Sequence, residues 1–335
     1  MLSLGLPSFL RPGPRLRLLV LEVSERCDQR CAHCSIWSAS AEGASLTLAE
    51  RLAVVDDALR GGVREALLTG GEPLLAADLW PVAERLRAGG ARLMLATTGM
   101  QLERHAAQVA RSFHEVYVSL DGGRPATHDA QRGVASFARL AAGVKALRAL
   151  DPRPLVVARS TVHAGNADEL AETVALARRI GADHVSFLPV DAQSDAFGGA
   201  PDGRRALVPG EDQVRRLEAA VAALERGGAH ADGFLLESPA KLRALVRHLE
   251  ASRTGTPHER PRCDAPRWSS VVTADGRVRP CFFHPPVGDA RQGVTAVRTS
   301  PAYAAALARI EAPNGTCASC VCPKFRGSPW REVWS

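Results

Sequence analysis

The chain has 335 residues, of which 46% are hydrophobic and 23% charged, and 42 Lys and Arg residues against 36 Asp and Glu give a net charge of +6. This composition excludes a disordered chain, and the length allows one large or two ordinary domains with a buried core. Only three of the basic residues are lysines, a bias that GC-rich coding produces without selection for a basic surface. The charge is therefore weak support for nucleic acid or an anionic membrane, and we expect neither partner.

The N-terminal segment gives no sign of targeting. No run of about 18 apolar residues occurs, so we predict no membrane span. Residues 1–23 do not fit a signal peptide, because Arg11, Arg15 and Arg17 interrupt the apolar stretch and no small-residue cleavage site follows. We predict a cytoplasmic protein, where clustered cysteines more often bind metal or do redox chemistry than form disulfides.

Six short apolar, β-branched runs alternate with amphipathic helical segments in the first part of the chain. The helical segments carry apolar residues three and four positions apart, for example Leu52, Val55 and Leu59. This alternation is typical of βα units around a parallel sheet. The predicted strands begin near Leu16, Glu65, Arg92, Glu115, Leu155 and His184.

The pattern changes after Val190. Residues 191–210 are rich in Gly, Asp, Ser and Pro and predict a loop, a candidate lid over the C-terminal edge of the sheet. The Asp275-Gly276 pair between β-branched runs predicts a hairpin over residues 269–281. Three further helices are predicted at 211–226, 239–251 and 301–311, and a Pro- and Arg-rich linker at 254–262.

Eight cysteines form two groups, separated by residues 35–262, which contain none. The first group, Cys27, Cys31 and Cys34, is a CxxxCxxC motif directly after the first strand. In a βα barrel, loops at the carboxyl ends of the strands build the active site. Three thiolates can hold three irons of a [4Fe–4S] cluster and leave the fourth iron open to an exogenous ligand. A zinc site completed by His33 is the alternative.

The second strand ends in Gly70-Gly71-Glu72-Pro73. Two glycines let the backbone approach a ligand closely, and a carboxylate at a strand end can accept hydrogen bonds from an amine. A plain turn into the next helix is the alternative interpretation. Because this motif lies one strand after the CxxxCxxC motif, the two together are more specific than either alone.

These two motifs and the six βα units resemble the radical SAM superfamily over residues 16 to about 190. The resemblance implies a partial (β/α)6 barrel in which S-adenosylmethionine chelates the open iron of the cluster. It implies reductive cleavage to methionine and a 5′-deoxyadenosyl radical, which abstracts a substrate hydrogen, with electrons from a reductase such as flavodoxin or ferredoxin. It also implies that Gly70, Gly71 and Glu72 line the methionine amino group.

The resemblance assigns roles to further residues near strand ends. Ser119 is implied to contact the carboxylate or ribose of S-adenosylmethionine, and Asp121 to lie near the substrate as a catalytic residue, with a plain Asp-Gly turn as its alternative. Arg132 and Arg159 are candidates for pairing with the carboxylate of S-adenosylmethionine, because Arg suits bidentate pairing. Leu188 is a candidate for packing against the adenine. For the two arginines the alternative is a solvated position on the surface, and for Leu188 it is a place in the ordinary hydrophobic core.

The second group consists of Cys263, Cys281, Cys317, Cys320 and Cys322. The C-x12-G-x4-C element at its start resembles the opening of the SPASM and twitch extensions of radical SAM enzymes, with a zinc knuckle as the alternative. A two-cluster SPASM domain needs more than the five cysteines present. The resemblance therefore implies one auxiliary [4Fe–4S] cluster on Cys263, Cys281 and two of the distal cysteines. Cys317 and Cys320 are our first choice, and Cys322 is not excluded.

We therefore predict an N-terminal extension over residues 1–15, a partial radical SAM barrel over 16–235 and a small α+β twitch/SPASM-like domain over 236–335. The predicted enzyme is an oxidoreductase that completes a dehydrogenation or cross-link with the auxiliary cluster as an electron relay. Direct binding of substrate to an open iron of that cluster is the alternative.

The sequence leaves the substrate open. Because 26 residues precede Cys27, fewer than a leader-binding domain needs, a small molecule such as a sugar or aminocyclitol alcohol is favoured over a ribosomal peptide. A cyclase of the molybdenum-cofactor type is disfavoured, because such enzymes end in Gly-Gly and this chain ends in Trp334-Ser335. A zinc-binding, Arg-rich nucleic-acid-binding protein is the alternative from another class, and would show salt-dependent binding.

Overall fold

The computed structural model describes residues 15–38, 45–192, 194, 196–198, 201–256, 263–318 and 320. All six predicted strands are present and pair in parallel, each with the next along the chain. They lie in one sheet in the order β6-β5-β4-β3-β2-β1-β7-β8-β9. The first six are β1 (Leu18–Ser24), β2 (Glu65–Gly70), β3 (Arg92–Thr97), β4 (Glu115–Ser119), β5 (Leu155–Val162) and β6 (His184–Pro189).

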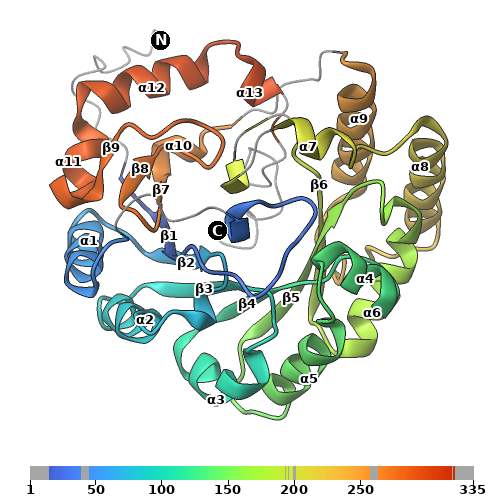
Figure 1. The fold of residues 1–335 in the computed structure, drawn as a ribbon, viewed down its shortest axis with the longest axis horizontal. Coiled ribbons are helices and arrows are strands. Elements are labelled where there is room, and N and C mark those ends of the chain that lie inside the picture. Colours follow the sequence, from blue (N-terminus) through green and yellow to red (C-terminus); the bar gives the residue numbers. More distant parts are fainter. Residues whose placement is uncertain are drawn as a thin grey trace, which may run out of the picture.

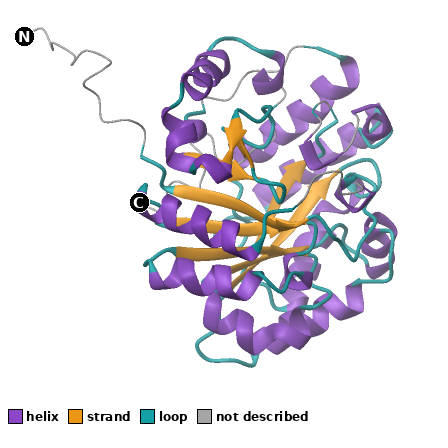
Figure 2. Ribbon diagram, turned by 60° about the vertical axis from the view of Figure 1, so that its left-hand side comes forward, coloured by secondary structure: helices purple, strands orange, loops and turns teal. Residues whose placement is uncertain are grey.

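The helices between the strands cover one face of this sheet, the outer face of an open barrel (Figures 1 and 2). Alternation along each strand divides the apolar side chains between two cores. The larger core lies between sheet and helices, and a smaller one on the inner face includes Leu18, Val20, Met94 and Tyr117. The predicted partial barrel is confirmed. Its helices are α1 (Leu48–Arg60), α2 (Leu79–Ala88), α3 (Leu102–Ser112), α4 (Pro125–Arg132), α5 (Phe137–Arg148) and α6 (Leu170–Ile180).

The segment predicted as a loop over 191–210 contains two short helical elements, η5 (Ala196–Gly198) and α7 (Pro201–Arg205). The prediction was wrong there because helices this short show no apolar periodicity. The helices predicted next along the chain are confirmed as α8 (Glu211–Arg226) and α9 (Pro239–Thr254). No helix in the described part of the chain combines the length and hydropathy needed to cross a bilayer.

The predicted hairpin is confirmed as β7 (Ser269–Val272) and β8 (Arg277–Arg279), which pair antiparallel. The sequence did not indicate that β7 also pairs in parallel with β1, with Leu18 opposite Ser269, so that one sheet continues from the barrel into the C-terminal part. Residues 257–262 of the predicted linker lie outside the described residues. The remaining elements are α10 (Ala265–Trp268), β9 (Gly288–Asp289), α11 (Val294–Thr299), α12 (Pro301–Glu311), as predicted, and α13 (Gly315–Ala318).

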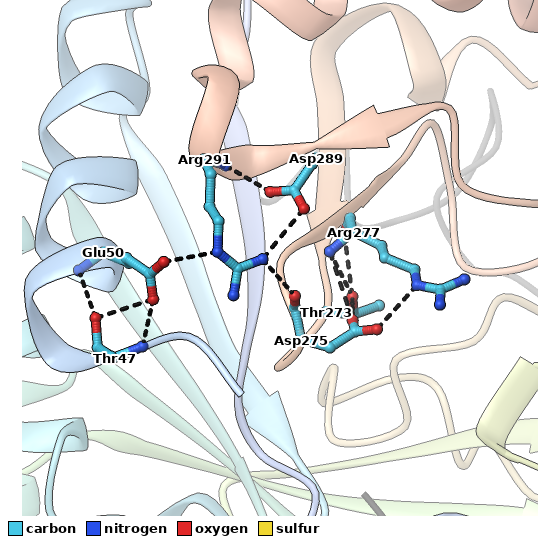
Figure 3. Close-up of polar contacts among 7 residues, drawn as sticks. All are labelled: Thr47, Glu50, Thr273, Asp275, Arg277, Asp289 and Arg291. Carbon is cyan, nitrogen blue, oxygen red and sulfur yellow. Dashed lines mark hydrogen bonds and ion pairs between the residues drawn. The ribbon is translucent and has the colours of Figure 1, made fainter. Parts of the chain in front are cut away.

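A polar network on the surface joins the C-terminal part to the start of α1 (Figure 3). Glu50 accepts hydrogen bonds from the backbone N–H of Thr47 at 2.8 Å and from its hydroxyl at 2.9 Å, which closes a capping box. The other carboxylate oxygen of Glu50 accepts from Nε of Arg291 at 2.6 Å. Arg291 in turn contacts Asp289 and the carbonyl oxygen of Asp275, both at 3.1 Å.

This network predicts a pH-dependent contribution to stability. The backbone and hydroxyl of Thr47, together with Arg291, lower the pKa of Glu50 from 4.5 to about 2. Since the folded-state pKa is the lower one, the stabilisation is complete above pH 4.5 and is lost as the pH falls toward 2. We expect the difference in Tm between the wild type and Glu50→Gln to shrink over that range in thermal melts. A constant difference would contradict the prediction, and Arg291→Ala should remove much of the same pH dependence.

Candidate functional site

The loop that carries the first three cysteines follows β1 at the carboxyl edge of the sheet, and is the blue loop in the middle of Figure 1. Cys31 is buried, Cys27 and Cys34 are partly exposed, and none of the three forms a disulfide. Burial raises the pKa of Cys27 to about 12 and also raises that of Cys34. Such thiols ionise when a bound metal replaces the proton, so this donor set suits a thiolate-ligated cluster.

The Gly-Gly-Glu turn packs directly against the chain that enters the cysteine loop. The N–H of Gly71 donates to the carbonyl of Ser24, and the N–H of Glu72 to that of Arg26, both at 2.7 Å. A Cβ on Gly70 would lie 2.1 Å from the oxygen of Ser24, and one on Gly71 2.3 Å from that of Arg26. The two glycines thus permit a close backbone approach, as predicted. The backbone that approaches them in this structure is the segment that enters the cysteine loop.

The side chain of Glu72 is buried and accepts hydrogen bonds from three protein donors. The carboxylate accepts from the backbone N–H of Leu74 at 2.9 Å, from the N–H of Thr98 at 2.6 Å and from the hydroxyl of Thr97 at 2.8 Å. It is 0% exposed, and burial raises its pKa to about 7. The oxygens of this carboxylate therefore hold the ends of β2 and β3 together. The expected contact of Glu72 with the methionine amino group stays a prediction.

Asp121 and Arg132 form a buried ion pair behind the cysteine loop. Arg132 Nη2 lies 2.8 Å from Asp121 Oδ2, and the two residues are 6% and 0% exposed. Burial alone would raise the pKa of Asp121, but Arg132, His33, His163 and the backbone N–H of Thr161 together outweigh it, so that the pKa lies below its ordinary value. Neither side chain is open to a ligand in this arrangement. The predicted contacts of Asp121 with substrate and of Arg132 with S-adenosylmethionine stay predictions.

Three other predicted binding residues do keep accessible surface. Ser119 and Arg159 are register partners on β4 and β5, and Leu188 lies at the end of β6; all three are partly exposed. The guanidinium of Arg159 lies over the ring of Tyr117 at 4.9 Å, on the inner face of the sheet. The predicted contacts of these three residues with S-adenosylmethionine stay predictions. Their partly exposed positions at or near the strand ends are compatible with such contacts.

Glu22 is a partly exposed carboxylate on β1 that was not predicted as a site residue. Glu22 shares the inner face with Leu18 and Val20, because side chains alternate along a strand. Burial raises its pKa to about 7, with Arg279 of the hairpin opposing the shift. The available signal was a charged residue within an otherwise apolar strand, Leu-Leu-Val-Leu-Glu-Val-Ser.

The second cysteine group gathers in one pocket. Residues that line it include Cys263, Cys281, Cys317 and Cys320, the first choice from the sequence, whereas Cys322 lies outside the described residues. His284, which the sequence analysis did not single out, also lines this pocket. Its Nε2 lies 3.3 Å from Sγ of Cys317. The arrangement fits a cluster held by four thiolates, with one imidazole beside a ligating sulfur.

Phe197 lies between the two cysteine groups. Its carbonyl accepts from the backbone N–H of Ser35 at 2.9 Å, beside Cys34. Its ring lies 6.0 Å from that of Phe282 and 6.2 Å from that of Phe283, which follow Cys281. Phe197 is the one described non-glycine residue with positive φ, at 65°, a conformation that sequence patterns do not reveal.

Among the described residues, no three His, Cys, Asp or Glu side chains converge closely enough to hold a single metal ion.

A cysteine loop at the carboxyl edge of a partial βα barrel is the arrangement of an iron–sulfur enzyme with a partial-barrel fold. The chain belongs to the radical SAM superfamily, whose family model matches residues 21–185. Its cofactors are S-adenosylmethionine and a [4Fe–4S] cluster.

Two curated proteins and one solved structure illustrate the similarity. The chain is 34% identical to AdoMet-dependent heme synthase of Methanosarcina barkeri over 53% of its own length and 52% of the relative, about half of each. It is 30% identical to GTP 3′,8-cyclase 1 of Pseudomonas aeruginosa over 81% of both chains. SuiB of Streptococcus suis, solved with S-adenosylmethionine, shares the fold with a TM-score of 0.65 and 17% identity over 92% of this chain and 72% of SuiB.

Proposed function

We propose that this enzyme is an oxidoreductase with a second [4Fe–4S] cluster, which receives the electron that a substrate radical gives up. The observation that carries the proposal is the pocket shared by Cys263, Cys281, Cys317 and Cys320. Four protein thiolates fill the ligand positions of a cubane and leave no iron open, which favours an electron relay over direct binding of substrate. Assignment of residues 236–335 to a separate auxiliary domain is part of this proposal.

The sheet supports a fixed spacing between the two cysteine groups. Because β7 pairs with β1, the hairpin that ends before Cys281 and the strand that ends before Cys27 belong to one hydrogen-bonded sheet. The backbone of Phe197 contacts Ser35 in the first cysteine loop, and its ring contacts Phe282 next to Cys281. A substrate held at the carboxyl edge of the barrel would lie within reach of both groups.

A two-electron oxidation also releases a proton. The radical removes one hydrogen atom from the substrate, one electron leaves to the second cluster, and one proton must go to a base. Glu22 fits this role, because it is partly exposed on the inner face of β1 and burial raises its pKa to about 7, near the working pH of a general base.

For the substrate we propose a small molecule, and the match to GTP 3′,8-cyclase over 81% of both chains supports this class. A peptide is the second candidate, supported by the shared fold with SuiB, which was also solved with its precursor peptide SuiA. Candidates of both classes, GTP included, should be tested as deuterated substrates. Transfer of deuterium into 5′-deoxyadenosine identifies the substrate, and transfer from a peptide alone would overturn the small-molecule proposal.

Replacement of Cys281 by Ala tests the relay. We expect 5′-deoxyadenosine to form at near the wild-type rate while the oxidised product is lost, because the cysteine loop after β1 is intact and the second cluster is not. Bound iron should fall from about eight to about four atoms per chain, measured after anaerobic reconstitution. Thr316→Ala, which alters the same pocket without removing a thiol, should keep the iron. Retention of product in the Cys281→Ala variant would refute the relay.

A further inference from the structure

A buried arginine contacts the first cysteine loop directly. Arg132 is the last residue of α4 and is 6% exposed. Its Nη1 lies 3.5 Å from Sγ of Cys31 and 3.4 Å from Oε1 of Gln29, which is 1% exposed. Cys31 is the buried member of its loop. A cationic donor therefore meets a cluster-binding sulfur in a part of the molecule that is shielded from solvent.

Asp121 orients this guanidinium. Its Oδ2 lies 2.8 Å from Nη2 of Arg132, while its Oδ1 accepts from the backbone N–H of Thr161 at 2.7 Å. Each terminal nitrogen of Arg132 thus has its own partner, the carboxylate for one and the sulfur for the other. Burial of such a pair is costly unless both charges are well placed. The fixed carboxylate keeps the other edge of the guanidinium directed at Cys31.

The backbone around Arg132 holds the cysteine loop independently of this side chain. The N–H of Arg30 donates to the carbonyl of Arg132 at 2.9 Å, and the N–H of Ala32 to that of Gln131 at 3.2 Å. Gly133 has a φ of 68°, and a Cβ there would lie 2.5 Å from the oxygen of Arg30. Because these contacts involve only main chain, they remain available to the loop when the Arg132 side chain is replaced.

We propose that Arg132, oriented by Asp121, is a positioning residue that sets the reduction potential of the cluster bound by Cys27, Cys31 and Cys34. A cluster gains negative charge on reduction, so a cationic donor at a ligating sulfur stabilises the reduced state and raises the potential. Low dielectric around buried groups strengthens this interaction. Arg132 and Asp121 thus act on the cluster through Cys31.

Redox titration of the reconstituted holoenzyme, followed by electron paramagnetic resonance, tests this proposal. The signal to follow is the one that disappears when Cys27, Cys31 and Cys34 are all replaced by Ala. In Arg132→Met we expect the ratio of reduced to oxidised cluster at a given potential to fall about tenfold, a decrease of about 59 mV for a one-electron couple. Arg132→Gln, which keeps polar donors but no charge, should shift in the same direction by less.

Arg51 provides a matched control. It is 5% exposed and pairs with Asp78 at 2.5 Å, between α1 and α2 on the outer side of the barrel. Arg51→Met removes an equally buried arginine, whose partner Asp78 is partly exposed, and should leave the potential unchanged. The proposal is overturned if Arg132→Met retains its iron and its wild-type potential, or if Arg51→Met shifts the potential equally. If Arg132→Met does not fold, Arg132→Gln decides by the same criterion.

Discussion

Replacing Cys31 with Ala is expected to reduce the formation of 5′-deoxyadenosine to the level of a reaction without enzyme. The cluster needs three thiolates so that its fourth iron stays open to S-adenosylmethionine, and Cys31 is the buried member of that set. We expect that the two remaining, partly exposed thiols do not retain an active cluster. The measurement is chromatographic detection of 5′-deoxyadenosine after anaerobic reconstitution and reduction with dithionite.

Ser35→Ala is the matched control in the same loop. Ser35 binds the carbonyl of Phe197 through its backbone N–H at 2.9 Å, a contact that Ala preserves. This variant should form 5′-deoxyadenosine at near the wild-type rate and keep its iron. A Cys31→Ala variant with wild-type turnover would show that the radical is generated elsewhere and would remove the loop from the active site.

The elements that the sequence predicted well are those with local signals. Each of the six strands is a short apolar run that begins near the predicted residue, and α8 spans residues 211–226 as predicted because its apolar positions repeat with the helical period. The hairpin followed from Asp275-Gly276, whose turn chemistry is equally local. The cysteine motifs belong to the same class, since their spacing is visible along the chain.

Contacts between distant segments could not be predicted from such patterns. The pairing of β7 with β1 joins residues far apart in sequence and has no local signature. The sequence does not show that Thr97 and Thr98 lie beside Glu72. The same holds for Arg132, whose partners Asp121 and Cys31 come from other loops. Both are buried charged groups, whose protein partners only the fold supplies.

Gly71→Ala is expected to damage the site almost as severely as the loss of a cysteine. The added Cβ would lie 2.3 Å from the carbonyl oxygen of Arg26 and 2.7 Å from its carbonyl carbon, and both are backbone atoms just before Cys27. The cysteine loop or the Gly-Gly-Glu turn must therefore move. Overpacking of this kind costs about 1–3 kcal/mol, which lowers the Tm by several degrees, and the displaced loop should lose iron and form 5′-deoxyadenosine at least tenfold more slowly.

Gly203→Ala separates this effect from the general cost of replacing a glycine. Gly203 lies in α7, and a Cβ there would meet nothing within 4 Å. Because Ala favours helix over Gly, that variant should keep its iron, its rate and its Tm. If Gly71→Ala behaved like Gly203→Ala, the turn would not fix the cysteine loop. If Gly71→Ala kept its iron but lost affinity for S-adenosylmethionine, the backbone of this turn would be a ligand contact as well as a support for the loop.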